Sequence, residues 1–167
     1  MQIPKRKSEQ NIKRKTFDPF ITQTKYDQIK AEVDKMKNTI RPKLASEVKR
    51  LAELGDFSEN AEYQIAKGKL RGLNNRILEF EEQLKHCEII KTNNNNQVVE
   101  LGNFVTVESA GKQSTYQILG SAETNPDTGI ISRNSPLGSA LLGKKICDQV
   151  EIILRDKTTN FKIISIK

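Results

Sequence analysis

Residues 63–87 read YQIAKGKLRGLNNRILEFEEQLKHC, and the apolar positions of this stretch decide the fold. They recur at alternating steps of three and four residues, at Tyr63, Ala66, Leu70, Leu73, Ile77, Phe80, Leu84 and Cys87. This heptad spacing predicts a long helix with an apolar stripe that packs along a partner helix.

The partner helix is predicted directly upstream. Apolar residues there follow a similar period, at Tyr26, Ile29, Val33, Met36, Ile40, Leu44, Val48 and Leu51. The steps lengthen after Ile40, which indicates a stutter, and Pro42 lacks a backbone donor, so we expect a local bend there. Gly55 is a typical helix end. Because two long helices joined by a short turn lie antiparallel, residues 21–91 are predicted to form a coiled-coil finger about 45 Å long.

Residues 98–167 carry a different pattern. Short β-type runs occur at Phe104–Glu108, Thr115–Leu119, Gly129–Ser132, Gln149–Leu154 and Phe161–Ile166. Turn signals separate them, notably at Asn125–Gly129 and Arg155–Asn160. Ser135 as N-cap, Pro136 at the first helical position and Gly143 as the stop predict one short helix. The expected class is therefore α+β: a helical hairpin, an Asn-rich linker over 92–97, and a small antiparallel β domain with one helix.

Charge is concentrated at the N-terminus. Residues 1–15 hold six basic residues and one acid, which is +5 of the formal net charge of +7. We expect residues 1–20 to be a disordered basic extension, because so few of them could be buried. Residues 1–15 are either a nucleic-acid contact, a contact to an acidic protein, or a solubilising arm.

Composition excludes several classes of function. No run of about 18 apolar residues and no apolar secretory region occurs, so we expect a cytoplasmic protein without a membrane span. Two cysteines and one histidine cannot build a four-ligand zinc site. Aromatic residues make up 5% of the chain and Trp is absent, which argues against a deep aromatic pocket.

The turn between the two helices, residues 55–63, reads GDFSENAEY and is rich in carboxylates. Asp56 could cap the second helix, with Glu59 completing a capping box. Alternatively, Asp56 and Glu59 present oxygen atoms to Mg²⁺, which proteins often hold with one or two carboxylates. Such a partial site could complete a two-metal centre in another enzyme.

This turn resembles the tip signature of the bacterial transcript cleavage factors GreA and GreB. Residues 131–144, ISRNSPLGSALLGK, independently resemble the C-terminal signature of that family, and Arg41-Pro42 is also similar. The resemblance extends from about residue 20 to residue 167 and implies an FKBP-like C-terminal domain that docks on RNA polymerase.

The resemblance also implies a mechanism. The finger would enter the secondary channel of the polymerase, where Asp56 and Glu59 help hold a shared Mg²⁺ while the polymerase hydrolyses the backtracked RNA 3′ end. The chain would activate another enzyme, would hold no cofactor tightly, and is expected to be a monomer. The turn of Asn134, Ser135 and Pro136 matches the docking loop of the family. Candidates for contacts to the nascent RNA are the basic finger residues Arg50, Lys67, Lys69, Arg71 and Arg76.

Three alternatives stay open. A paralogue of the same architecture could occupy the channel and inhibit, although the retained Asp56 and Glu59 favour an activator. A prolyl isomerase of the FKBP type would need an aromatic pocket, and the β domain has only Phe104, Tyr116 and Phe161. A coiled-coil adaptor or nucleic-acid binder would depend on the basic extension.

Overall fold

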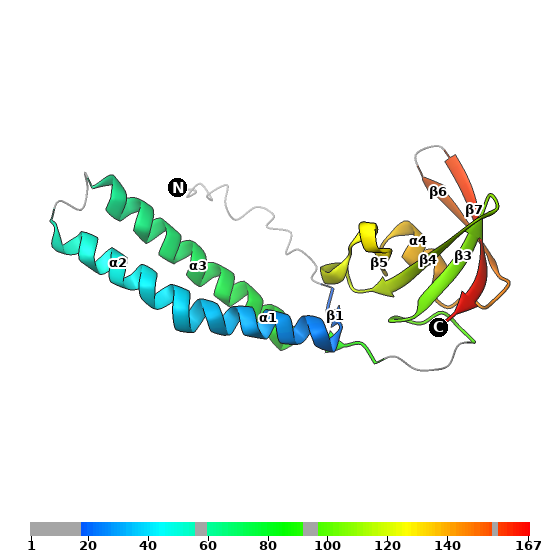
Figure 1. Ribbon diagram of the computed structural model, residues 1–167, viewed down its shortest axis with the longest axis horizontal. Coiled ribbons are helices and arrows are strands. Elements are labelled where there is room, and N and C mark those ends of the chain that lie inside the picture. The colour runs from blue at the N-terminus through cyan, green and yellow to red at the C-terminus, as the bar shows by residue number, and fades with distance from the viewer. Residues whose placement is uncertain (1–17, 56–59, 92–96, 155–156) are drawn as a thin grey trace, which may run out of the picture.

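The computed structural model describes residues 18–55, 60–91, 97–154 and 157–167. A helical finger extends from one side of a small β domain (Figure 1). The finger and its base comprise β1 (Phe20–Ile21), α1 (Gln23–Lys35), the π-helical segment η2 (Met36–Ile40), α2 (Arg41–Glu53), α3 (Ala61–His86) and β2 (Glu88–Ile89). The β domain comprises β3 (Phe104–Ser109), β4 (Lys112–Leu119), the 3₁₀ turns η3 (Ser121–Glu123) and η4 (Pro126–Thr128), β5 (Ile130–Ser132), α4 (Pro136–Leu141), β6 (Gln149–Leu154) and β7 (Lys157–Ile166). The predicted α+β class is confirmed.

The finger is held together by the predicted apolar seam. Ile29, Val33, Met36 and Ile77 form a buried cluster, and Ile40, Leu73, Phe80 and Leu84 pack against it. Nearer the far end, Leu51 and Ala66 are also buried. Every one of these residues lies at a position that the heptad spacing assigned to the seam, since burial of that stripe is what stabilises an amphipathic helix pair.

The irregularity predicted near Pro42 lies just before it. Met36–Ile40 is π-helical, and the backbone N–H of Arg41 donates to the carbonyl of Met36, five residues back. Pro42 then occupies the first turn of α2, where a missing N–H is tolerated. Gly55, with φ +78°, follows the end of α2 as expected of a helix stop.

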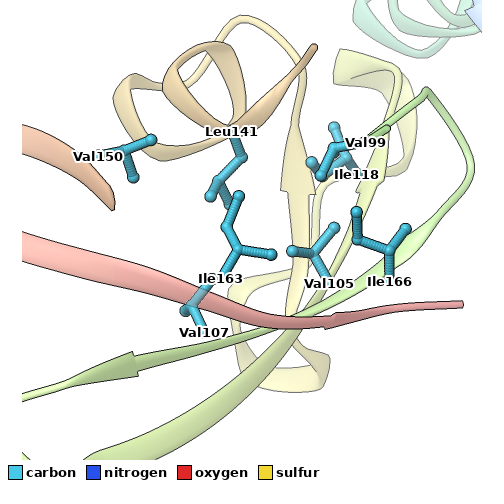
Figure 2. Packing of buried hydrophobic residues seen from close by; sticks show 8 residues of the cluster. All are labelled: Val99, Val105, Val107, Ile118, Leu141, Val150, Ile163 and Ile166. Carbon is cyan, nitrogen blue, oxygen red and sulfur yellow. The ribbon is translucent and has the colours of Figure 1, made fainter. Parts of the chain in front are cut away.

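The β domain is built on one five-stranded sheet in the order β5-β4-β3-β7-β6. Its buried core comprises Val99, Val105, Val107, Ile118, Leu141, Val150, Ile163 and Ile166 (Figure 2). Leu141 comes from α4, Val99 from the segment before β3, and the others from β3, β4, β6 and β7. The prediction of an antiparallel sheet was wrong in one detail: β5 pairs parallel to β4, so the sheet is mixed. The connection through η3 and η4 carries the chain back along β4, so that Ile130 lies opposite Gln117. From there β5 runs in the same direction as β4.

Two strands begin earlier than predicted because the hairpins are tight. Ser109 pairs with Lys112 across Ala110 and Gly111, which both have positive φ, as a two-residue hairpin turn requires. β7 begins at Lys157, so most of the predicted turn over Arg155–Asn160 is strand. The short helix α4 is confirmed: the Ser135 hydroxyl caps it by accepting from the N–H of Gly138.

The base of the finger is closed by a two-residue parallel ladder between β1 and β2. Ile21 in β1 is fully buried, and the carboxylate of Asp18 accepts hydrogen bonds from the β domain. The extension predicted over residues 1–20 is therefore too long, because residues 18–20 belong to the folded structure. Residues 1–17 and most of the predicted linker, 92–96, lie outside the described residues.

Candidate functional site

The predicted metal-positioning residues, Asp56 and Glu59, lie outside the described residues. Both flanks of the turn that carries them are described: α2 ends at Glu53 and α3 begins at Ala61, at the far end of the finger from the β domain (Figure 1). The site is therefore presented at the end of a helical hairpin, separated from the β-domain core by the length of α3.

Helix α3 is capped by Asn60. Its side-chain oxygen accepts a hydrogen bond from the N–H of Tyr63 at 3.0 Å. The hypothesis that Asp56 caps this helix was wrong, because the N-cap position belongs to a residue four places later. The third helical position is Tyr63, so no capping box with Glu59 exists either.

The basic residues proposed for RNA contact are all exposed, but they do not form one face. With about 100° between successive helical residues, Lys67 and Arg71 lie on one flank of α3, whereas Lys69 and Arg76 lie on the other. Arg50 is exposed on α2.

Two of these five cations already have partners on the finger. The guanidinium of Arg76 forms an ion pair with Glu32 across the hairpin at 2.9 Å and lies 5.2 Å from the centre of the Phe80 ring. The ammonium of Lys67 lies 5.7 Å from the centre of the Tyr63 ring. Arg50, Lys69 and Arg71 form no ion pair among the described residues, which leaves their charge available to an anionic partner.

The predicted docking turn is placed at the start of α4. Asn134 and Pro136 are exposed, and Ser135 is half-buried as the N-cap of α4. The Ser135 hydroxyl also donates to the carbonyl of Ser132 at 2.6 Å. These bonds give the turn a fixed shape, with Pro136 exposed on it and the Asn134 side chain held by hydrogen bonds of its own.

The structure adds residues to this turn that the sequence did not indicate. The side-chain amide of Asn134 donates to Asp18 at 3.2 Å and to the hydroxyl of Ser121 at 3.2 Å. Asp18 and Asn134 are 116 positions apart, and neither periodicity nor a turn signal links them.

The described residues contain no group of three or more side chains of the kinds that commonly bind metals. No helix within the described ranges is long and apolar enough to cross a membrane. Among the described thiols, burial raises the pKa of Cys87, which is half-buried at the end of α3, and Cys147 is exposed.

Known proteins match both parts of the chain. The family model for the C-terminal part of the transcription elongation factors GreA and GreB matches residues 94–167, and the model for their N-terminal part matches residues 19–89. The transcription elongation factor GreA of Staphylococcus epidermidis is 37% identical over 150 residues, which are 88% of this chain and 95% of that protein. GreA of Thermosipho africanus is 35% identical over 150 residues, covering 89% and 96%.

A solved structure is also similar. The GreA factor homolog 1 (Gfh1) of Thermus thermophilus is 23% identical, with 90% of this chain and 99% of that chain covered and a TM-score of 0.41. The assignment rests on the family models and the relatives, which cover nearly all of the described chain. The chain belongs to the GreA/GreB family of transcription elongation factors.

Proposed function

We propose that this chain is a transcript cleavage factor. It binds RNA polymerase through its β domain, inserts the finger into the secondary channel, and stimulates the polymerase to hydrolyse backtracked nascent RNA. In this proposal the bond is cleaved in the polymerase active centre, so the chain is an activator and not itself a nuclease.

The observation that carries the proposal is the cap of α3. Acidic residues at a helix start are ordinarily explained by capping, but Asn60 performs that role here. The N-cap of α3 therefore does not account for Asp56, and Asp56 and Glu59 lie in the turn at the end of the finger far from the β domain. Their retention in the family's tip motif supports a role outside the chain.

Asp56 and Glu59 would hold the shared Mg²⁺ of the polymerase. Carboxylate oxygens suit this hard cation, and two of them leave positions for water and phosphate oxygens. The ion would supply charge neutralisation for phosphodiester hydrolysis. The finger of this chain would deliver the two carboxylates to the polymerase active centre.

The free cations of the finger fit the second part of the proposal. Arg50, Lys69 and Arg71 are exposed without an ion-pair partner in the described residues. Because Lys69 and Arg71 lie on opposite flanks of α3, the flank that faces the extruded RNA 3′ end would contact its phosphates. Arg76 contributes less to this contact, since its guanidinium is shared with Glu32 and Phe80. The docking contacts would come from Asn134, Ser135 and Pro136.

The test is RNA cleavage in a stalled, backtracked elongation complex. Asp56→Asn and Glu59→Gln remove one charge each without touching the Asn60 cap. A matched control is Glu79→Gln, which removes the same charge from an exposed position on α3 about 27 Å from the start of that helix.

Wild type and Glu79→Gln are expected to stimulate cleavage, and Asp56→Asn and Glu59→Gln to lose nearly all of it at unchanged polymerase binding. Tight binding by wild type without any cleavage would refute the proposal and identify an inhibitory channel binder instead. Equal activity of all four proteins would show that the tip carboxylates have no part in the reaction.

A further inference from the structure

Two carboxylates join the base of the finger to the β domain. Asp18 lies just before β1 and is 9% exposed, and Glu123 lies in η3 of the β domain. Each accepts hydrogen bonds from the other part of the molecule. We call these two residues and their partners the clasp.

Asp18 reaches from the finger into the β domain. Its Oδ2 accepts from the backbone N–H of Ser121 at 2.9 Å, from the Ser121 hydroxyl at 3.0 Å, and from the Asn134 amide at 3.2 Å. Its Oδ1 accepts from the N–H of Phe20 at 3.3 Å. All four groups around the Asp18 carboxylate are hydrogen-bond donors. A carboxylate, which only accepts, can bond to all of them, whereas an amide in its place would direct an N–H at another donor.

The donors and acceptors in the hydrogen bonds that link Asp18, Ser121 and Ser132 can be assigned in only one way. Because the Ser121 proton goes to Asp18, the Ser132 hydroxyl must donate in its 2.9 Å contact with Ser121. Ser132, which is 8% exposed, then accepts from the N–H of Asn134 at 3.0 Å. Asp18 therefore orders the same turn that precedes α4 and carries the proposed docking residues.

Glu123 makes the reverse connection, from the β domain to the first helix of the finger. Its two carboxylate oxygens accept from the N–H of Thr22 at 2.6 Å and from the Thr22 hydroxyl at 2.7 Å. Thr22 is the N-cap of α1, where its hydroxyl also accepts from the N–H of Lys25. The negative charge of Glu123 thus lies at the positive end of the helix dipole, where it is favourable.

Close packing surrounds the clasp. A Cβ atom on Gly120 would lie 1.7 Å from the carbonyl oxygen of Phe20, so the two backbones meet without room for a side chain. The Arg133 guanidinium lies 4.5 Å from the centre of the Phe20 ring. β1 leads into α1 and β2 follows α3, so the ladder between β1 and β2 holds both helices of the finger to this contact.

We propose that Asp18 and Glu123 are positioning residues that set the angle of the finger relative to the β domain, and that tip-dependent cleavage requires this angle. The second clause rests on the proposed function. The helices between residues 23 and 53 span about 45 Å, so a tilt of about 10° at the base would move the tip by about 8 Å. Ligands of Mg²⁺ must lie about 2.1 Å from the ion, so a tilt of that size would remove the tip acids from it.

The angle is measurable without polymerase. One spin label is attached to the native, exposed Cys147 and a second to an Asn75→Cys substitution on the exposed face of α3, in a Cys87→Ala background. Pulsed electron paramagnetic resonance then gives the distribution of distances between the β domain and the finger. Asp18→Ala, Glu123→Ala and the double variant are compared with Glu151→Gln, an exposed acid of β6 without a hydrogen-bond partner among the described residues.

We expect a narrow distribution for the parent protein and for Glu151→Gln, and a broader one for each clasp variant, broadest for the double variant. Far-ultraviolet circular dichroism verifies that each variant is folded. If Asp18→Ala does not fold, Glu123→Ala carries the test, because within the described residues the Glu123 carboxylate accepts hydrogen bonds from Thr22 alone. Unchanged distributions in the folded clasp variants would overturn the proposal.

The cleavage assay separates positioning from docking. For Glu123→Ala we expect the rate at saturating factor to fall about tenfold or more, because misplacement by ångströms has large effects on rate. The factor concentration at half-maximal effect should stay the same, since Glu123 is not a docking residue. A broadened distribution with an undiminished maximal rate would refute the positioning role. If the wild type itself fails to stimulate cleavage, the proposed function fails, while the distance distributions still decide whether the clasp fixes the angle.

Discussion

Two glycines in the middle of α3 permit a sharp test of the structure. Gly68 and Gly72 lie one turn apart inside the helix, and beyond the adjoining backbone of α3 itself an added Cβ atom would meet no heavy atom within 4 Å at either position. Neither has a positive φ, so nothing in the backbone requires glycine there. Replacing both with alanine should therefore stabilise the finger, by restricting the unfolded chain and improving helix propensity.

The expected magnitude follows from helix propensity. Alanine is favoured over glycine by about 0.5–1 kcal/mol in a helix interior, so Gly68→Ala/Gly72→Ala should add about 1–2 kcal/mol to the free energy of unfolding. For a chain of 167 residues, this raises the midpoint of thermal unfolding by about 2–8 °C. Thermal and urea unfolding, followed by far-ultraviolet circular dichroism, measure both quantities.

Glycine-to-alanine substitution at two positions without room for a Cβ atom is the control. A Cβ atom on Gly138 would lie 2.1 Å from the carbonyl oxygen of Ser132, and one on Gly120 would clash with Phe20. Gly138→Ala and Gly120→Ala should each destabilise the protein, by about 1–3 kcal/mol or more, because backbone atoms must move. If the α3 variant were destabilised as well, the outward face of α3 would not be open and the reasoning would fail.

Further predictions concern the seam, an ion pair and the thiols. Ile77→Ala should lower the free energy of unfolding by about 2–5 kcal/mol, since Ile77 is buried in the seam; urea unfolding checks this. Arg76→Ala should cost no more than about 1 kcal/mol in the same assay, and less at high salt, because its pair with Glu32 is largely exposed. A thiol reagent should modify Cys147 before Cys87, and modification of Cys87 should accelerate as pH rises, because burial raises the pKa of its thiol and the thiolate is the reactive form; mass spectrometry at several pH values measures both rates.

The finger could be predicted from the sequence because its information is local. Ile29, Val33 and Ile77 are buried where the heptad period places them, and the helix ends carry ordinary stop and cap residues. The family assignment was also accessible, because the tip and the turn before α4 are contiguous motifs. The α+β class follows because the heptad spacing of apolar residues ends before residue 91, and short β-type runs replace it in the second half of the chain.

The clasp between the finger and the β domain could not be predicted, because the residues that form it are far apart in the sequence. Asp18 follows a run of basic residues, so the charge of its surroundings indicated a solvated extension, yet its carboxylate is buried against Ser121, 103 positions away. The parallel pairing of β5 depends in the same way on where the turns η3 and η4 bring the chain. The cap of α3 was predicted at Asp56, but the helix begins four residues later and Asn60 caps it, because residue type alone does not fix where a helix begins.

The stutter in the first helix shows how a sequence irregularity is accommodated without loss of the seam. Two successive steps of four after Ile40 would turn Leu44 by about 40° and Val48 by about 80° away from the direction of Ile40 in a regular α-helix. In the π-helical turn before Arg41, one backbone hydrogen bond spans five residues instead of four, so one extra residue is absorbed there. The next step, from Val48 to Leu51, is three residues and turns the stripe back to within about 20° of Ile40, and Leu51 is buried beyond the stutter. Pro42 follows immediately, at the start of the next regular helix, where its missing N–H removes the least. The π-helical turn, Pro42 and the lengthened steps therefore lie within one short segment, and the seam is buried again beyond it at Leu51 and Ala66.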